Sequence, residues 1–545
     1  MSFRSDRLGL IAALLGLATA ARGATVDLHH QRIPVAGAPA AVFSVDLDRD
    51  GRRDLAMAVV STEWGEIGVE ELQAIDEVGT YVEVLTVVPA LFDRRELVVH
   101  LGAEGGGFAG EALSLELPES VHALLPGPSG APLLAWTDEG VSSVEIVAGE
   151  AEAGPGLALE PRIEEVSPIF GSGDFLSGVR LTHDLDGDGE LDLLLPTASG
   201  YAVFLGSAEG IAAEPAARFA APLEERLPGD ARHYRTGTVR HLPIPEVLDL
   251  DGDRRPELVF RNHDRQWNQM RVLPNRGGGR FGAPVDPLGG RDPHADPEVV
   301  WVGDLDGDGR AEIVTQEELE PDDDSLRAEL AWAKRPLQRY RVHRLGAGLL
   351  WNPEPERSFE LYGYVFEGSD EIPLPVGVGD LDGDGRADLV AMTLDFSLAS
   401  ALRVMTVRSM RLGLDFEPAC QRADGRFVAV PGQDLGGKFT LRLTNLRFPQ
   451  LSSFSGDFDG DGQADFLQLG RGRKVTVRRG EGACRFPAAS AATVELAAEP
   501  ADLALVRVED LDGDGRSDLA VTQPPPAGEP GGQGWLDLYL SGGAP

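Results

Sequence analysis

The sequence predicts an all-β fold, a β-propeller of four-stranded blades closed into a ring. Two features of the 545 residues support this prediction: a nine-residue acidic pattern recurs seven times, and each copy is followed by alternating apolar and polar runs that end in glycine-rich turns. Alternation with a period of two is typical of strands, and a unit repeated along the chain indicates a propeller or solenoid. The 67 glycines and 38 prolines support the same prediction, because both residues favour turns over helices.

The N-terminus has the pattern of a secretory signal peptide. Arg4 and Arg7 precede an apolar run at 8–20, and small residues follow it. The alternative, a membrane anchor, would need about 20 apolar residues, and no later stretch is long enough to span a bilayer. We therefore predict a signal peptide at 1–23 and one propeller at 24–545, exported to the extracellular space, the periplasm or the cell surface.

The charge excludes one class of partner. The chain has 49 basic and 89 acidic residues, a net charge of −40, whereas a nucleic-acid-binding protein needs clustered Lys and Arg. Seven loops with four carboxylates each account for 28 of the acidic residues (7 × 4), and seven bound Ca²⁺ would change the net charge to −26 (−40 + 14). The remaining charge gives a solvated surface, so we expect a soluble monomer.

The clearest acidic copy is DLDGDGRAD at 380–388. It carries carboxylates at positions one, three, five and nine and glycine at position six, and the carbonyl at position seven is a further donor. Two carboxylates about 4 Å apart repel by roughly 4 kcal/mol at an effective dielectric of 20. Ca²⁺ takes six to eight oxygen ligands, so this loop predicts a calcium site.

The residues after the loop exclude an EF-hand. That motif needs a bidentate Glu at position twelve and a flanking helix on each side, but Ala391 occupies this position within the apolar run LVAM. The flanking residues have strand patterns, so the loop is predicted to be the tip of a β-hairpin.

Up to seven structural Ca²⁺ sites follow, one for each copy. The predicted ligands stand at positions one, three, five, seven (through the carbonyl) and nine: Asp46, Asp48, Asp50, Arg52 and Asp54; Asp184, Asp186, Asp188, Glu190 and Asp192; Asp249, Asp251, Asp253, Arg255 and Glu257; Asp304, Asp306, Asp308, Arg310 and Glu312; Asp380, Asp382, Asp384, Arg386 and Asp388; Asp457, Asp459, Asp461, Gln463 and Asp465; Asp510, Asp512, Asp514, Arg516 and Asp518.

The spacing of the copies predicts the number of blades. From the second copy onward they are 65, 55, 76, 77 and 53 residues apart, and the first gap of 138 is twice the average. A copy without ligands fills that gap at 123–149, with Gly130 at position six. Counting it favours eight blades over seven, and the strand at 25–35 is predicted to complete the C-terminal blade and close the ring.

These residues resemble a known family. The acidic hairpin, the strand after it and GGGRFGAP at 277–284 are similar to the FG-GAP repeat of integrin α-subunit propellers and of related bacterial VCBS-repeat proteins. The resemblance covers nearly the whole mature chain and implies a β-propeller with Ca²⁺ in the hairpin loops. Two copies depart from the pattern, with Arg254 at position six of one and Glu257 and Glu312 at position nine. Because Arg enters a left-handed turn at a cost, the site at 249–257 should be the weakest.

A ligand-binding face is predicted from two polar connections. Trp beside Arg and Asn is suited to stacking on a sugar ring while bonding its hydroxyls, whereas the alternative is a surface loop that packs its own Trp. The candidate residues are Arg261, Asn262, His263, Arg265 and Trp267 in one connection and His233, Tyr234 and Arg235 in the other.

The chain has two cysteines. Cys420 and Cys484 follow equivalent runs of successive copies, so they form either a disulfide or two buried thiols.

The sequence has no HExxH, GxSxG or phosphate-binding glycine loop, so we assign no catalytic residue. We expect a binding or adhesion module for a glycan or protein; the alternative is an exported carbohydrate-active enzyme similar to a polysaccharide lyase.

Overall fold

The computed structural model describes residues 26–61, 87–88, 94–118, 120–137, 140–147, 150–158, 175–176, 180–197, 200–223, 225–228, 238–241, 243–262, 267–290, 297–321, 323, 325–346, 348–366, 377–397, 409–442, 451–470, 472–500, 505–525 and 532–542. The predicted signal peptide lies outside these residues.

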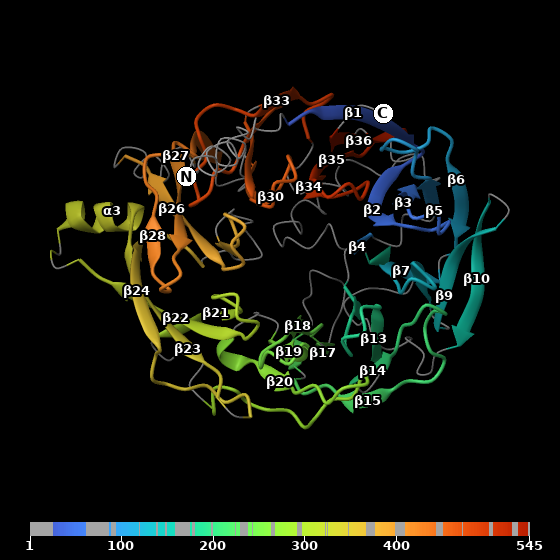
Figure 1. The fold of residues 1–545 in the computed structure, drawn as a ribbon, viewed down its shortest axis with the longest axis horizontal. Helices are drawn as coiled ribbons and strands as arrows, with labels where there is room; N and C mark the ends of the chain where they lie inside the picture. Colours follow the sequence, from blue (N-terminus) through green and yellow to red (C-terminus); the bar gives the residue numbers. More distant parts are fainter. Residues whose placement is uncertain are drawn as a thin grey trace, which may run out of the picture.

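Eight antiparallel sheets stand around a ring as the blades of a propeller (Figure 1). Six of the sheets have four strands, one has five, and one has three among the described residues. The predictions of an all-β propeller and of eight blades are therefore confirmed. Blade 2 is the copy without acidic ligands, so this stretch kept its strands although it lacks the carboxylates.

The first four blades follow the chain in order. Blade 1 contains β2 (Ala38–Val45), β3 (Asp54–Ser61), β5 (Arg94–His100) and β6 (Leu113–Leu117); blade 2 contains β7 (Val121–Pro126), β8 (Leu133–Thr137), β9 (Gly140–Val147) and β10 (Glu150–Ala158); blade 3 contains β12 (Thr182–His183), β13 (Asp192–Thr197), β14 (Gly200–Phe204) and β15 (Ala217–Ala220); blade 4 contains β18 (Glu246–Leu248), β19 (Glu257–Phe260) and β20 (Arg271–Leu273).

The other four blades complete the ring. Blade 5 contains β21 (Glu298–Gly303), β22 (Glu312–Leu319), β23 (Leu337–Arg344) and β24 (Arg357–Tyr362); blade 6 contains β25 (Gly377–Gly379), β26 (Asp388–Asp395), β27 (Ser409–Gln421), β28 (Phe427–Ala429) and β29 (Gly437–Arg442); blade 7 contains β30 (Leu451–Gly456), β31 (Asp465–Leu469), β32 (Lys474–Arg478) and β33 (Ala492–Glu495); blade 8 contains β34 (Val506–Glu509), β35 (Asp518–Gln523), β36 (Gly534–Ser541) and β1 (Leu28–Val35).

The strands differ in burial according to their place in the blade. The second strand is covered on both sides by neighbouring blades, and in β3 seven consecutive residues, 54–60, are buried. The outermost strands β15 and β33 instead alternate between partly buried and exposed residues, as expected for a strand with one face in solvent. Apolar side chains of neighbouring blades therefore form the core between them; Leu55 of blade 1 and Leu538 of blade 8, for example, belong to one cluster.

The N-terminal strand closes the ring, as predicted. β1 pairs antiparallel with β36 over eight residues, so the first strand of the chain is the outermost strand of the last blade. Arg32 holds the carboxylate of Asp537 through two hydrogen bonds of 2.7 and 2.8 Å, and His30 adds a contact of 2.8 Å. Burial alone would raise the pKa of Asp537, but these partners hold it below its ordinary value.

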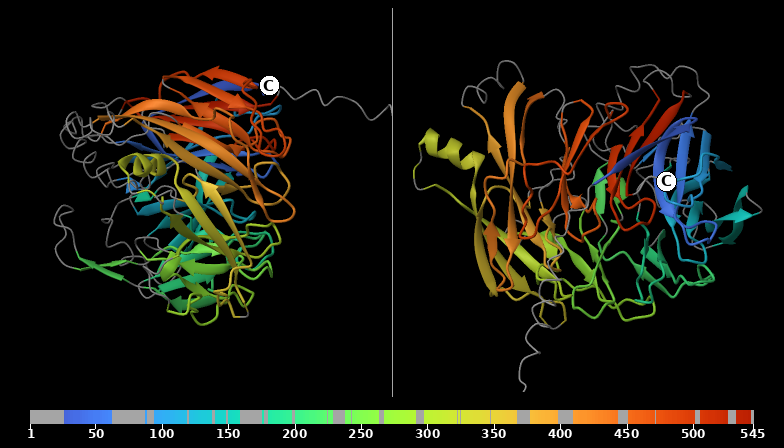
Figure 2. Two further views of the ribbon diagram at one scale, coloured as in Figure 1. Left: turned by 90° about the vertical axis from the view of Figure 1, so that its left-hand side faces the viewer. Right: turned by 45° about the horizontal axis from the view of Figure 1, so that its top comes forward.

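The connections between strands divide the ring into two faces. Because neighbouring strands are antiparallel, all acidic loops, which join the first strand of a blade to the second, lie on one face, here called the loop face. Connections from the second strand to the third and from one blade to the next lie on the opposite face, the connection face. The helix α3 (Leu326–Lys334) and the hairpin of β16 (Glu225–Pro228) and β17 (Thr238–His241) extend from this face, on the same side in the left view of Figure 2.

Two further elements belong to connections. β4 (Val87–Val88) pairs with β11 (Phe175–Leu176), and η3 (Trp267–Gln269) lies between the second and third strands of blade 4. Among the described residues, no helix has both the length and the apolar character needed to cross a bilayer.

Candidate metal sites in the acidic loops

Each acidic loop is shaped by its own carboxylates. In the loop of blade 6, Asp380 at position one accepts hydrogen bonds of 2.8 Å from the N–H groups of Gly383 and Gly385. Asp384 at position five accepts one of 3.0 Å from the N–H of Arg386. The bonds between positions one and six and between positions five and seven recur in the other acidic loops, so the carboxylates hold the chain in a tight turn.

Position six requires a left-handed backbone. Gly385 has φ 82°, and Arg254 adopts φ 65° at the same place in the loop of blade 4. Arg254 also donates its N–H to Asp249 at 2.8 Å, so this loop closes like the others. The departure in sequence therefore leaves the shape of the loop intact and costs backbone strain instead.

Replacing Arg254 by glycine should relieve that strain. A side chain in the left-handed region costs roughly 1 to 2 kcal/mol, partly offset by the greater freedom that glycine has in the unfolded chain. We expect Arg254→Gly to raise the free energy of unfolding by about 0.5 to 1 kcal/mol in denaturant titrations. The control Arg255→Gly, at a neighbouring position without positive φ, should not stabilise; equal stabilisation by both would contradict this explanation.

The carboxylate at position nine connects the loop to the strands of its own blade. The carboxylate of Asp388 is fully buried and accepts N–H groups from Leu381 at 2.9 Å and from Gln421, on β27, at 2.7 Å. Burial raises its pKa to about 6, and burial raises the pKa of Glu257 and Glu312 at the same position to about 7. A bound cation would stabilise the ionised forms of these groups.

Position three supplies the oxygens that lack partners. The Oδ1 atoms of Asp186 and Asp382 are buried and accept no hydrogen bond from the described residues. The same holds for Oδ1 of Asp306 and Asp459, although an arginine contacts the other oxygen of each of these two carboxylates. An unpaired buried oxygen is costly, and a cation would satisfy it.

The carboxylates also converge. One oxygen each from Asp184, Asp186 and Asp192 lie within 4.8 Å of one another, and similar groups occur in other loops. Hard oxygen donors at this density fit Ca²⁺, so the donor set and the geometry agree with the predicted metal.

The acidic loops of blades 5 to 8 are linked to one another. The N–H at position eight of one loop donates to a carbonyl of the loop before it: Ala387 to Leu305 and Ala464 to Leu381 at 3.1 Å, and Ser517 to Asp457 at 2.6 Å. Glycine at position four permits this approach, because a Cβ on Gly307 would lie 1.9 Å from the carbonyl oxygen of Gly385. Neighbouring loops of blades 5 to 8 are therefore in direct backbone contact on the loop face, which the sequence alone did not reveal.

The loop of blade 1 departs from the pattern at position four. It has Arg49 at position four, with φ 61°, and its neighbour, blade 2, has no acidic loop. The guanidinium of Arg49 instead donates to the carbonyl of Gly130 in blade 2. Arginine is accommodated here because no second acidic loop approaches.

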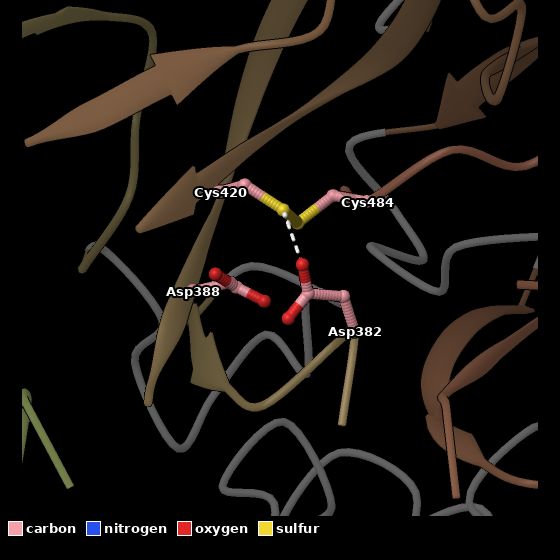
Figure 3. A group of neighbouring side chains, drawn as sticks. All are labelled: Asp382, Asp388, Cys420 and Cys484. Atoms are coloured by element: carbon pink, nitrogen blue, oxygen red, sulfur yellow. Dashed lines mark hydrogen bonds between the residues drawn. A yellow bond between two sulfur atoms is a disulfide. The ribbon is translucent and has the colours of Figure 1, made fainter. Parts of the chain in front are cut away.

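The two cysteines lie beside the loop of blade 6. Cys420 and Cys484 form a disulfide with Cα atoms 5.7 Å apart, which joins blades 6 and 7 (Figure 3). Cys420 Sγ lies 3.4 Å from Asp382 Oδ2, a contact without a hydrogen bond because a disulfide sulfur carries no hydrogen. Ala483, beside Cys484, donates its N–H to the same oxygen at 3.1 Å. The disulfide therefore holds the next blade against this carboxylate.

The predicted sugar-stacking residue, Trp267, is partly buried. Trp267 packs against the core between blades 4 and 5, and the guanidinium carbon of Arg261 lies 4.2 Å from the centre of its ring. Arg261 also pairs with Glu246, and Asn262 is buried. This arrangement favours the alternative, a connection that packs its own Trp. The remaining candidates lie outside the described residues: His233, Tyr234, Arg235, His263 and Arg265.

A groove that sequence reasoning missed lies between blades 5 and 6. Its lining includes Arg335, Tyr362, Glu417 and Phe427. Tyr362 is 50% exposed at the connection-face end of β24, and the guanidinium carbon of Arg335 lies 4.8 Å from the centre of its ring. The signal in the sequence was an aromatic residue at an outward position of an outermost strand.

Comparison with known proteins identifies the repeat. A model of the FG-GAP-like repeat matches residues 249–315 and 457–521. The chain contains FG-GAP-like repeats. Each match begins at position one of an acidic loop and ends in the strand after the next acidic loop, which agrees with the predicted resemblance. No curated protein matched the sequence.

Two solved structures show partial similarity to this chain. One is an Agrocybe aegerita lectin that recognises non-reducing terminal N-acetylglucosamine; it is 15% identical, with a TM-score of 0.38, over 74% of this chain and 94% of its own. The other is the Tc holotoxin pore of Photorhabdus luminescens, 14% identical with a TM-score of 0.30 over 82% of this chain and 18% of its own. Neither likeness bears on the ligand of this chain.

Proposed function

We propose that this FG-GAP-like propeller is an exported, calcium-stabilised binding module that presents its connection face to a glycan or protein and catalyses no reaction. Calcium would be held by the carboxylates at positions one, three, five and nine and by the carbonyl at position seven, as in Asp380, Asp382, Asp384, Asp388 and Arg386. Its role would be structural, since it neutralises converging carboxylates.

The linked loops support the structural role most directly. The N–H groups of Ala387 and Ala464 bond to the preceding loops, so whatever orders one acidic loop also positions its neighbour. The buried, unpaired Oδ1 of Asp382 is one atom that a cation would satisfy. Calcium in the loops would therefore stabilise contacts between blades as well as within them.

The division of the faces supports a binding role. The acidic loops occupy one face, and α3, η3 and the β16–β17 hairpin lie in connections on the other. The groove near that face combines exposed Tyr362 with Arg335 and Glu417, which suits a ligand with both a flat apolar surface and hydroxyl or charged groups. The alternative, a carbohydrate-active enzyme, would require the two polar connections to form one pocket, and most of their candidate residues lie outside the described residues.

Two measurements test the proposal. Metal-stripped protein should take up several Ca²⁺ in equilibrium dialysis, in preference to Mg²⁺; no uptake at millimolar calcium would reject the calcium sites. In the presence of calcium, the protein should bind a ligand on a glycan or protein array, and Tyr362→Ala or Arg335→Ala should reduce this binding. The control Leu326→Ala, an exposed position on α3 outside the groove, should bind normally. Binding unaffected by the groove variants would place the ligand site elsewhere.

A further inference from the structure

The acidic loop of blade 5 contains a guanidinium group among its carboxylates. Arg344, on β23, lies 2.7 Å from Asp306 at position three, 2.6 Å from Asp308 at position five and 3.3 Å from Glu312 at position nine. Its Nε lies 2.9 Å from Glu356. One arginine therefore contacts three of the four carboxylates that were predicted to bind calcium.

The loop of blade 7 repeats this arrangement with a different arginine. Arg479 Nε lies 2.7 Å from Asp459 Oδ2, and its Nη2 lies 2.7 Å from Asp461 Oδ2. The side chain of Asp459 is fully buried, so this contact is largely shielded from solvent. Position three and position five are thus paired by one guanidinium in both loops.

The arginines occupy equivalent places in the two blades. In blade 5, Glu312 at position nine lies opposite Arg344 of the third strand in the strand register. In blade 7, Phe466 lies opposite Arg478, so extending that register by one residue places Arg479 opposite Asp465 at position nine. Extending the registers of the other blades by one residue places uncharged side chains there: Leu101, Leu205, Pro274, Cys420 and Leu540.

The chemistry of arginine makes it a substitute for a metal ion. The guanidinium is always protonated in proteins, and its planar fork fits carboxylates with two parallel hydrogen bonds. A Ca²⁺ in the same loop would lie close to this positive charge and would have to displace it from the carboxylates at positions three and five. A leucine at the same place offers neither charge nor competing donors.

We infer that Arg344 and Arg479 are built-in counter-cations that take the place of calcium in the loops of blades 5 and 7. This inference rests on the proposed calcium binding of the other loops. The protein then binds five calcium ions, seven loops less two, and its ring combines five loops that depend on calcium with two that do not.

Calcium stoichiometry tests the inference. Metal-stripped protein dialysed against calcium should hold five ions by mass spectrometry of metals, Arg344→Leu should hold six, and Arg344→Leu with Arg479→Leu should hold seven. Leucine is the matched replacement because blades 1, 3 and 8 carry it at this place. The control Arg339→Leu, which removes an arginine that pairs with Glu317 and Glu360 on the same blade, should hold five.

The outcomes separate this inference from the proposed function. No calcium in the wild-type protein would reject calcium binding altogether, and seven in the wild-type protein would reject the counter-cations while leaving calcium binding intact. An unchanged count in the leucine variants would also overturn the inference. Should Arg344→Leu fail to fold without calcium, Arg344→Gln replaces it, and it is expected to bind calcium in the added site at least about tenfold more tightly than the wild-type loop.

Discussion

Deletion of residues 26–35 should open the ring and prevent stable folding. These residues include β1, which covers the edge of β36, and Ile33 and Val35 are 2 and 3% exposed in the core between blades 8 and 1. Burying each such side chain contributes about 1.5 to 3 kcal/mol. Asp537 would lose Arg32 and His30, and a buried charge without partners costs about 3 to 5 kcal/mol.

These losses together approach the whole stability of a typical domain, about 5 to 15 kcal/mol. Circular dichroism and size-exclusion chromatography should therefore show a poorly folded or associated chain, because the exposed edge of β36 is a template for another strand. Adding a peptide of residues 24–37 should restore the monomer, whereas a scrambled peptide should not. A shortened chain that stays monomeric and melts like the full chain would contradict closure by β1.

The ring could be predicted because its signals are local or regular. The hairpin loop carries its carboxylates within nine residues, and the average spacing revealed blade 2 although it has no acidic residue at the ligand positions. Closure followed from a strand without a partner at each end of the repeats. None of these inferences required the register between distant strands.

The arginines in the loops of blades 5 and 7 were not predicted, because their place depends on the register between the second and third strands. Arg344 follows Glu312 by 32 residues (344 − 312), but Arg479 follows Asp465 by only 14 (479 − 465), because the connections between second and third strands differ in length. No fixed spacing therefore marks the residue that faces position nine. The role of Trp267 could not be predicted for another reason: a Trp beside Arg and Asn suits a sugar site or internal packing equally well, and only its contacts distinguish the two.

Removal of calcium should lower the melting temperature at pH 8 by several degrees. If calcium is present at roughly ten times its dissociation constant, each site adds about 1.4 kcal/mol, so five sites add about 7 kcal/mol. An unfolding entropy of about 2.1 cal/mol/K per residue gives about 1.1 kcal/mol/K for a chain of this length, so the expected loss is about 6 °C. Differential scanning calorimetry of metal-stripped protein with and without added calcium measures it.

The size of this effect should depend on pH through position nine. Burial raises the pKa of Asp192 and Asp388 to about 6 and of Glu257 and Asp518 to about 7, above the values of about 4 in unfolded chains. The metal-free folded protein therefore binds more protons than the unfolded chain between these values, and its free energy of unfolding falls as the pH rises from about 4 to about 7.

Calcium and protons compete for the same carboxylates, so the two melting curves should converge on acidification. Metal-stripped protein should melt at a higher temperature at pH 5.5 than at pH 8, and added calcium should raise the melting temperature more at pH 8 than at pH 5.5. Strontium, a similar hard cation, should restore part of the effect, whereas potassium at matched ionic strength should not. An equal effect of calcium at both pH values would show that the carboxylate at position nine does not interact with the bound cation. The carboxylate ligands would then be those at positions one, three and five alone.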